Sequence, residues 1–178
     1  MMRATTILFA AAALAATGSI ALTAPRAAAQ DSMKGMSPDQ MKAMHAEHEK
    51  MMHAGIVQAR QAGFHLAVAS FLGIKAGIAR GDDVKTLALP AAALAGWGKA
   101  IPTMFPPGTD TPESDALPTV WSDRAGFETA AANMSAAART LADLGKAGDT
   151  AGFATQFGAL GKTCGACHKD YRKPEEKK

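Results

Sequence analysis

Residues 153–171 have the sequence FATQFGALGKTCGACHKDY, in which the larger side chains recur at intervals of three and four residues. These residues are Phe153, Phe157, Leu160, Cys164, Cys167 and Tyr171. The spacing is typical of an amphipathic α-helix, because residues three and four apart lie on one helical face. Asp149 or Thr150 can begin this helix, and Pro174 ends it. We therefore predict a C-terminal helix with both cysteines on its apolar face.

Three earlier segments have the same period. The first runs from about Gly55 to Gly81, and its apolar residues are Val57, Phe64, Val68, Phe71, Ile74 and Ile78. The second begins at Asp82 or Asp83, has Pro90 at a kink or at the start of a fresh helix, and carries Leu94, Trp97, Ile101 and Met104 or Phe105. The third runs from Ser122 or Asp123 to Gly145 or Gly148, with Phe127, Ala130, Met134, Ala137, Leu141 and Leu144.

The links between these helices are short except for residues 106–118, whose four prolines and one glycine predict a loop. A chain of 178 residues is long enough for one ordinary domain. Four amphipathic helices joined in this way predict an all-α fold, an antiparallel four-helix bundle over residues 54–178.

Cys164-Gly-Ala-Cys167-His168 is a C-x-x-C-H sequence, which is the attachment motif for c-type haem. On a helix these three side chains leave one face, so two thioether bonds and one axial nitrogen can reach a single porphyrin. Gly165 and Ala166 are small and allow the macrocycle to approach the backbone. We predict one covalent haem c, attached at Cys164 and Cys167 and ligated by His168.

Two other uses of C-x-x-C are a redox-active disulfide and half of a zinc site. The chain has two cysteines in all, whereas a structural zinc site needs further ligands. A thioredoxin-like site needs a βαβ context, which the helical pattern does not offer. The histidine after the second cysteine favours haem over both.

Residues 1–29 have the pattern of a secretory signal peptide. Arg3 precedes an apolar run, and Ala27-Ala28-Ala29 provides a small-residue cleavage site. A retained membrane anchor is the alternative, because the run is nearly long enough to span a bilayer. Its Ala-rich composition favours cleavage, which predicts a periplasmic protein without a stable membrane anchor.

The mature chain is close to neutral. Removing the two arginines of the leader from 19 basic residues leaves 17 against 16 acidic residues. A net charge near +1 argues against a nucleic-acid partner.

The chain resembles the class II c-type cytochromes, the cytochrome c′ family, over roughly residues 55–173. The matching motifs are Arg60-Gln61-Ala62, Leu117-Pro118-x-x-Trp121, Ala125-Gly126-Phe127 and Gly161-Lys162-x-Cys164-x-x-Cys167-His168-x-x-Tyr171-Arg172. In that family the residue four after the first-helix arginine faces the distal side of the haem. Methionine there accompanies a six-coordinate iron, and a bulky apolar residue accompanies a five-coordinate iron. The resemblance places Phe64 at this position and implies an open but crowded site.

The resemblance also makes Arg60 a candidate partner for a haem propionate, with an ordinary solvent-facing charge as the alternative. Arg172, one turn after His168, could tune the proximal imidazole or bind a propionate, or complement the C-terminus of the helix. The alternatives to an open site are ligation of the iron by His65, Met104 or Met134. His65 is turned about 100° from Phe64 around the helix, so it should not face the iron if Phe64 does.

Residues 30–53 depart from the family pattern as a His/Met-rich extension, with Met33, Met36, Met41, Met44, Met51, Met52, His45, His48 and His53. Thioether and imidazole groups at helical spacing could bind copper. The simpler interpretation is a floppy or amphipathic lead-in to the first helix.

Three functions follow from these features. The leading one is a periplasmic haem protein that binds nitric oxide and carbon monoxide; the others are a one-electron carrier for periplasmic redox proteins and a copper-handling protein. The chain has no nucleophile–base pair, so we do not predict an enzyme. The resemblance also implies a possible homodimer through the first two helices.

Overall fold

The computed structural model describes residues 35–174, and the chain divides into two compact units, 1–45 and 46–178. The predicted signal peptide therefore lies outside the described residues. In the N-terminal unit, Ser37 forms a capping box with Gln40: the backbone N–H of Gln40 donates to Ser37 Oγ (3.2 Å), and that of Ser37 donates to Gln40 Oε1 (2.8 Å). The cap marks the start of the first helix.

Helix α2, Pro38–Arg80, begins earlier than the sequence pattern indicated. We expected a helix start near Gly55, but the capping box at Ser37, with Pro38 at the first helical position, starts the helix 17 residues before that glycine. The His/Met-rich segment from residue 38 onward is therefore helical and continuous with the first helix of the bundle.

The remaining helices are α3 (Val84–Ala100), the 3₁₀ helix η1 (Ile101–Met104), α4 (Thr119–Ser122), α5 (Arg124–Ala147) and α6 (Thr150–Tyr171). The side chains of Asp83, Asp123 and Asp149 each accept a backbone hydrogen bond at a helix start. Gly148, at φ 75°, ends α5 in the left-handed conformation that glycine adopts without strain. Pro90 lies inside α3, so the alternative of a fresh helix at this residue is wrong.

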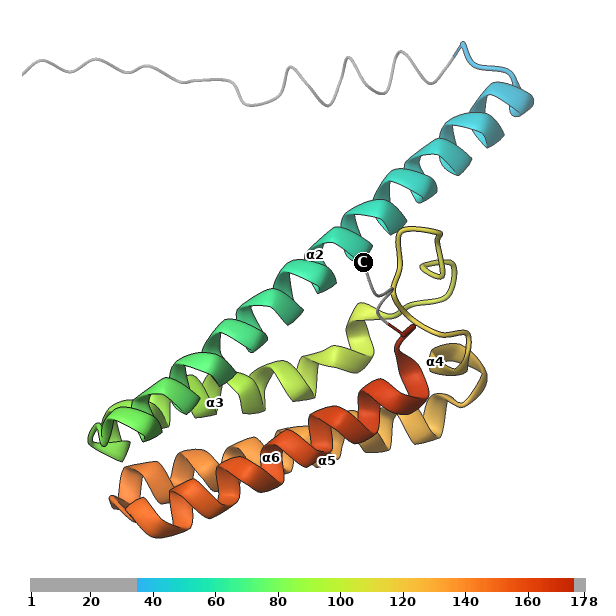
Figure 1. Ribbon diagram of the computed structural model, residues 1–178. Helices are drawn as coiled ribbons and strands as arrows, with labels where there is room; N and C mark the ends of the chain where they lie inside the picture. The colour runs from blue at the N-terminus through green and yellow to red at the C-terminus, as the bar shows by residue number, and fades with distance from the viewer. Residues whose placement is uncertain (1–34, 175–178) are drawn as a thin grey trace, which may run out of the picture. The chain divides into compact units, whose positions relative to one another are not determined.

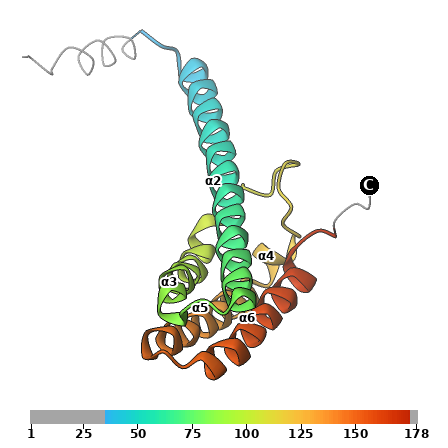
Figure 2. The same cartoon turned by 60° about the vertical axis from the view of Figure 1, so that its left-hand side comes forward.

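Within residues 46–178 the four long helices alternate in direction, as Figures 1 and 2 show. This confirms the predicted antiparallel four-helix bundle. Tight links join α2 to α3 and α5 to α6, and the longer segment 105–118 joins α3 to α5 at the other end of the bundle (Figure 1). No strand occurs within residues 35–174, where Ala116 and Arg172 form an isolated bridge.

Two apolar clusters fill the bundle. The larger one joins all four long helices through residues such as Ile74, Leu94, Leu141, Phe153 and Leu160. The smaller one lies at the end with the long loop and comprises Ile101, Phe105, Val120, Phe127 and Ala131, with Phe64, Trp97 and Tyr171 packed against it. The second cluster borders the region of the predicted site.

Helix α2 keeps much of its surface exposed. By length and composition it could cross a membrane, but Val57 and Ile74 are buried in the bundle. Val68, which we expected in the core, is 52% exposed. The buried stripe of α2 passes through Arg60 and Ile74, and Val68 is turned about 100° away from the midpoint between these two residues.

Two glycines of α3 test the packing of α3 against α5. A Cβ at Gly98 would lie 2.9 Å from the Ser135 backbone nitrogen, whereas one at Gly96 would have no neighbour within 4 Å. We expect Gly98→Ala to destabilise the protein by about 1–3 kcal/mol through overpacking. The matched control Gly96→Ala should be neutral or stabilise by up to about 1 kcal/mol. Thermal unfolding of both variants measures the difference, and equal melting temperatures would contradict this close helix contact.

Candidate haem site

Cys164, Cys167 and His168 lie in the last two turns of α6, as the C-x-x-C-H pattern predicted. Both cysteines are partly buried, and His168 is exposed. Burial raises the pKa of both thiols, and that of Cys167 is raised further by Cys164 and Asp170. A redox-active C-x-x-C site requires a lowered thiol pKa, so these cysteines do not have the electrostatics of a thioredoxin-like pair.

The zinc alternative lacks ligands as well. Among residues 35–174 no group of three or more His, Cys, Asp or Glu side chains is placed to hold a metal ion. A groove of about 320 Å³ runs beside Cys167 between α5 and α6, bounded by Asn133, Lys162, Asp170 and Tyr171. The C-x-x-C-H turn thus lies next to open space rather than within a closed metal cage.

Phe64 projects from α2 into an aromatic cluster. Its ring meets Trp97 edge-on at a centroid distance of 5.2 Å, and it lies 6.3 Å from Phe105. Gly63 makes the approach of the two helices possible, because a Cβ there would collide with the Trp97 indole. His65 is on the exposed face of α2, which agrees with the expectation that it turns away when Phe64 points inward.

Arg60 is 2% exposed, so the solvent-facing alternative is wrong. Its guanidinium donates to Thr109 Oγ1 (2.8 Å), the Thr109 carbonyl (2.7 Å), Ser114 Oγ (2.6 Å) and the Met104 carbonyl (3.3 Å). It also lies 4.3 Å from the centre of the Phe105 ring. Burial lowers the pKa of Arg60, but a guanidinium stays charged in proteins. All four of these acceptors are neutral groups, so the hydrogen bonds satisfy the donors of this buried cation without balancing its charge.

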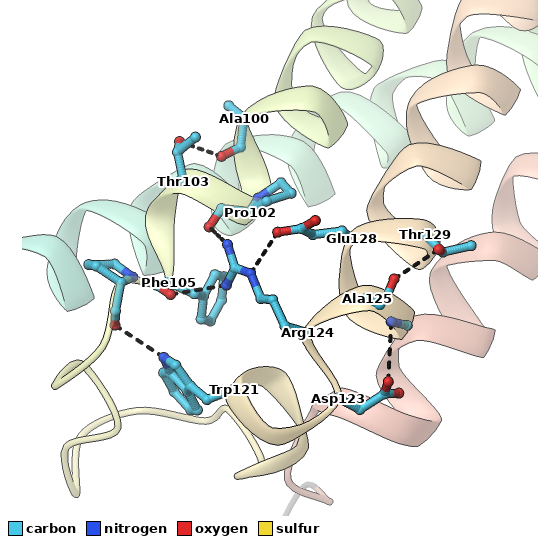
Figure 3. Close-up of polar contacts among 12 residues, drawn as sticks. Ala100, Pro102, Thr103, Phe105, Trp121, Asp123, Arg124, Ala125, Glu128 and Thr129 are labelled. Atoms are coloured by element: carbon cyan, nitrogen blue, oxygen red, sulfur yellow. Dashed lines mark hydrogen bonds and ion pairs between the residues drawn. The ribbon is translucent and has the colours of Figure 1, made fainter.

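A second arginine fixes the turn that carries Phe105. Arg124 donates to the carbonyls of Pro102 (2.6 Å) and Phe105 (3.1 Å), and its Nε pairs with Glu128 at 2.8 Å (Figure 3). Trp121 Nε1 donates to the Pro106 carbonyl at 3.1 Å (Figure 3). These bonds attach the 102–106 turn to α4 and to the start of α5, and they hold in place the Phe105 ring against which Phe64 packs.

Two buried polar groups, the Trp97 indole N–H and the Arg60 guanidinium, suit the propionates of a haem group. Trp97 Nε1 is buried and has no hydrogen-bond partner among the described residues. A buried donor without an acceptor is costly, and a propionate carboxylate is an acceptor that could satisfy it. The Arg60 guanidinium is hydrogen-bonded, but its acceptors are neutral, so a propionate could balance its buried charge. Cys164, Cys167 and His168 could hold the haem, while Phe64, Trp97 and Phe105 supply an apolar surround.

The remaining candidates lie around this cluster. Met104 and Met134 pack against it, and both stay alternatives to an open site. Arg172 follows the end of α6, where its backbone N–H donates to the His168 carbonyl at 3.2 Å. The Tyr171 hydroxyl donates to Asp123 Oδ2 at 2.8 Å, and this bond raises the Tyr171 pKa to about 12.

Sequence reasoning missed the acceptors of Arg60 and the role of Arg124. A signal for the first was available, because Arg60 falls between Val57 and Phe64 in the apolar stripe of its helix. A charged residue in a buried stripe needs partners, and the loop at 106–118 offers Thr109 and Ser114.

Known proteins resemble this chain in sequence and in fold. The family model described as cytochrome c′ matches residues 55–172. The cytochrome c′ of Rubrivivax gelatinosus is 37% identical over 120 residues, which are 65% of this chain and 92% of that protein. Its crystal structure matches with a TM-score of 0.60 at 34% identity and covers 66% of this chain and 94% of that one.

Two further relatives are a cytochrome c-556 and a cytochrome c′ mutant with bound nitric oxide. A cytochrome c-556 of Agrobacterium tumefaciens is 36% identical over 122 residues, 66% of this chain and 97% of that protein. A nitric oxide complex of a cytochrome c′ mutant from Alcaligenes xylosoxidans matches with a TM-score of 0.63 at 26% identity, over 69% of this chain and 97% of that one. The match of the family model to most of the bundle, together with the C-x-x-C-H turn on α6, establishes that the chain belongs to the cytochrome c′ family and binds one covalent haem c.

Proposed function

We propose that this protein binds nitric oxide and carbon monoxide at an open haem face beneath Phe64, with Cys164 and Cys167 attaching the haem and His168 ligating it. The observation that carries the proposal is the position of Phe64, packed on Trp97 and Phe105 while the neighbouring His65 is exposed. A haem iron with one vacant axial position binds small neutral diatomic molecules.

The side chains around the proposed open face select which ligands reach the iron. A phenyl ring offers no lone pair to the iron, and the surrounding Trp97 and Phe105 make the approach apolar. Water and anions lose hydration there without gaining a hydrogen bond, whereas nitric oxide and carbon monoxide lose little. The nitric oxide complex of the Alcaligenes xylosoxidans relative supports the same ligand class.

Arg60 and Trp97 would hold the haem rather than its gas ligand. Arg60 brings a buried positive charge, and Trp97 Nε1 brings a buried donor, so both suit a propionate. Arg172 would act on the proximal side of the haem, because its position next to the end of α6 suits a role beside the His168 imidazole.

Electron transfer is the second candidate, and the exposed surface of α6 favours it. Gly165 and Ala166 of the attachment turn are exposed, so a haem attached at this turn would lie close to solvent and to a redox partner. The similarity to a cytochrome c-556 is compatible with this function. Members of the family are in general non-enzymatic haem proteins of the periplasm, and we infer the same for this chain after removal of residues 1–29.

Pairing of two copies is a further part of the proposal. The bundle exposes four large apolar side chains on its first two helices: Leu66 (70%), Val68 (52%), Leu72 (53%) and Leu89 (78%). A second copy laid against α2 and α3 would remove this surface from water. A single monomeric boundary in sedimentation velocity would contradict the dimer.

The test of the main proposal is the optical spectrum of the holoprotein, oxidised, reduced, and reduced with carbon monoxide or nitric oxide. We expect a broad high-spin reduced spectrum that shifts when either gas is added, because Phe64 leaves one axial position vacant. A sharp low-spin reduced spectrum that carbon monoxide does not change would mean that His65, Met104 or Met134 ligates the iron. Electron transfer would then be the better assignment.

A further inference from the structure

The N-terminal part of α2 exposes methionine in a way that the other residues within 35–174 do not. Eight large apolar side chains among the described residues are exposed. The four before residue 53 are all methionine: Met41 (38%), Met44 (38%), Met51 (59%) and Met52 (54%). The four after it are all leucine or valine. If the first four served only as apolar contact surface, leucine and valine would serve there too, so the thioether is the distinguishing feature.

Three soft donors come together in the larger unit. His48, Met51 and Met52 stand at positions i, i+3 and i+4 of α2, and all three are exposed. Residues at these spacings share a helix face, with Cβ atoms about 5–6 Å apart. From the helix geometry the three span an arc of about 100°. One imidazole and two thioethers can therefore converge on an ion above this face.

The N-terminal unit contains a second set of one histidine and two methionines, in the reverse order along the chain. Met41, Met44 and His45 again stand at i, i+3 and i+4, and all are exposed. One histidine and two methionines thus occur at the same offsets twice within twelve residues.

His53 does not belong to either set. It lies outside the arc of His48, Met51 and Met52, its side chain is 23% exposed, and its imidazole packs against Gly108 of the long loop. Its Nε2 is 4.0 Å from Glu49 Oε1. The donors of the larger unit are thus confined to one turn.

The ligand type selects the metal. Methionine thioethers are soft donors that select Cu(I), and a neutral imidazole also binds it. Zinc would need thiolate, imidazole or carboxylate groups in a closed set, and residues 35–174 hold no cluster of three such side chains. We propose that His48, Met51 and Met52 form a Cu(I) site on the exposed face of α2, and that Met41, Met44 and His45 form a second site of the same kind.

The experiment is anaerobic equilibrium dialysis of the holoprotein against Cu(I) held at graded free concentrations by a competing chelator. Copper and iron are then measured by plasma mass spectrometry, and the haem iron gives the protein concentration because each chain carries one haem. We expect saturation at about two copper ions per iron, because each set supplies one three-donor site. Met51→Leu with Met52→Leu keeps the volume and removes the thioethers, so it should lose about one copper per iron. Adding Met41→Leu and Met44→Leu should remove the rest.

Glu47→Gln with Lys50→Gln is the matched control. It changes two exposed residues of the same turns, keeps the net charge and leaves every proposed donor in place, so its copper uptake should equal that of the wild type. Dialysis against Zn(II) should give no comparable uptake. Full copper binding by the Met51→Leu, Met52→Leu variant, or no copper binding by the wild type, would overturn the proposal. The exposed face of α2 would then be better explained as a contact surface for a helix of a partner protein. The haem spectra of the same samples test gas binding separately.

Discussion

Phe64→Met is expected to convert the proposed open haem site into a closed one. The substitution puts a thioether where the phenyl ring lies, next to Trp97 and Phe105, and a thioether ligates haem iron whereas a phenyl ring cannot. The reduced spectrum should change from broad high-spin to sharp low-spin. If the internal ligand leaves the site open about 1% of the time, the apparent affinity for carbon monoxide falls about 100-fold.

Phe64→Leu is the control for loss of the aromatic contacts. It removes the same edge-on packing against Trp97 but adds no ligand, so it should remain high-spin and continue to bind carbon monoxide. Covalent attachment at Cys164 and Cys167 should keep the haem in both variants. A high-spin Phe64→Met protein with unchanged carbon monoxide affinity would mean that residue 64 does not face the iron.

The features that were predictable from the sequence are those with local causes. The helix starts at Asp83, Asp123 and Asp149 and the end at Gly148 each depend on a side chain or backbone angle within one turn. Periodicity and these caps were enough to give four helices, and short links were enough to make them antiparallel.

The early start of α2 was missed although its cause, the capping box of Ser37 and Gln40, is local. The other features that were missed depend on distant parts of the chain. Val68 has the right residue type for the core, yet its exposure is decided by which neighbours α2 meets. Arg124 has the sequence surroundings of an ordinary helix-start residue, and its bonds to Pro102 and Phe105 exist only once the 102–106 turn folds back onto α5. The position of Phe64 came from resemblance to a family, since helical spacing alone gives the face of a residue and not its partner.

The Arg60 anchor gives the largest expected loss of stability. Arg60→Leu removes the donor for four acceptors on Met104, Thr109 and Ser114, of which Thr109 is 0% and Ser114 2% exposed. Leaving buried acceptors unsatisfied costs about 1–3 kcal/mol each, partly relieved where water enters, so we expect a loss of about 3 kcal/mol in the free energy of unfolding. This corresponds to a fall of about 10 °C in melting temperature.

Two further variants separate the network from the charge. Arg60→Lys keeps the positive charge but lacks the planar fork that reaches Thr109 and Ser114 together, so it should recover only part of the loss. Arg80→Leu removes an exposed arginine that pairs with Asp82 at the end of the same helix, and should change little. Thermal unfolding followed by circular dichroism ranks the three. If Arg60→Leu had the same melting temperature as the Arg80→Leu control, water would be replacing the Arg60 hydrogen bonds at no net cost. The 105–114 segment would then be held by its apolar contacts, with Phe105 rather than the guanidinium as the anchor.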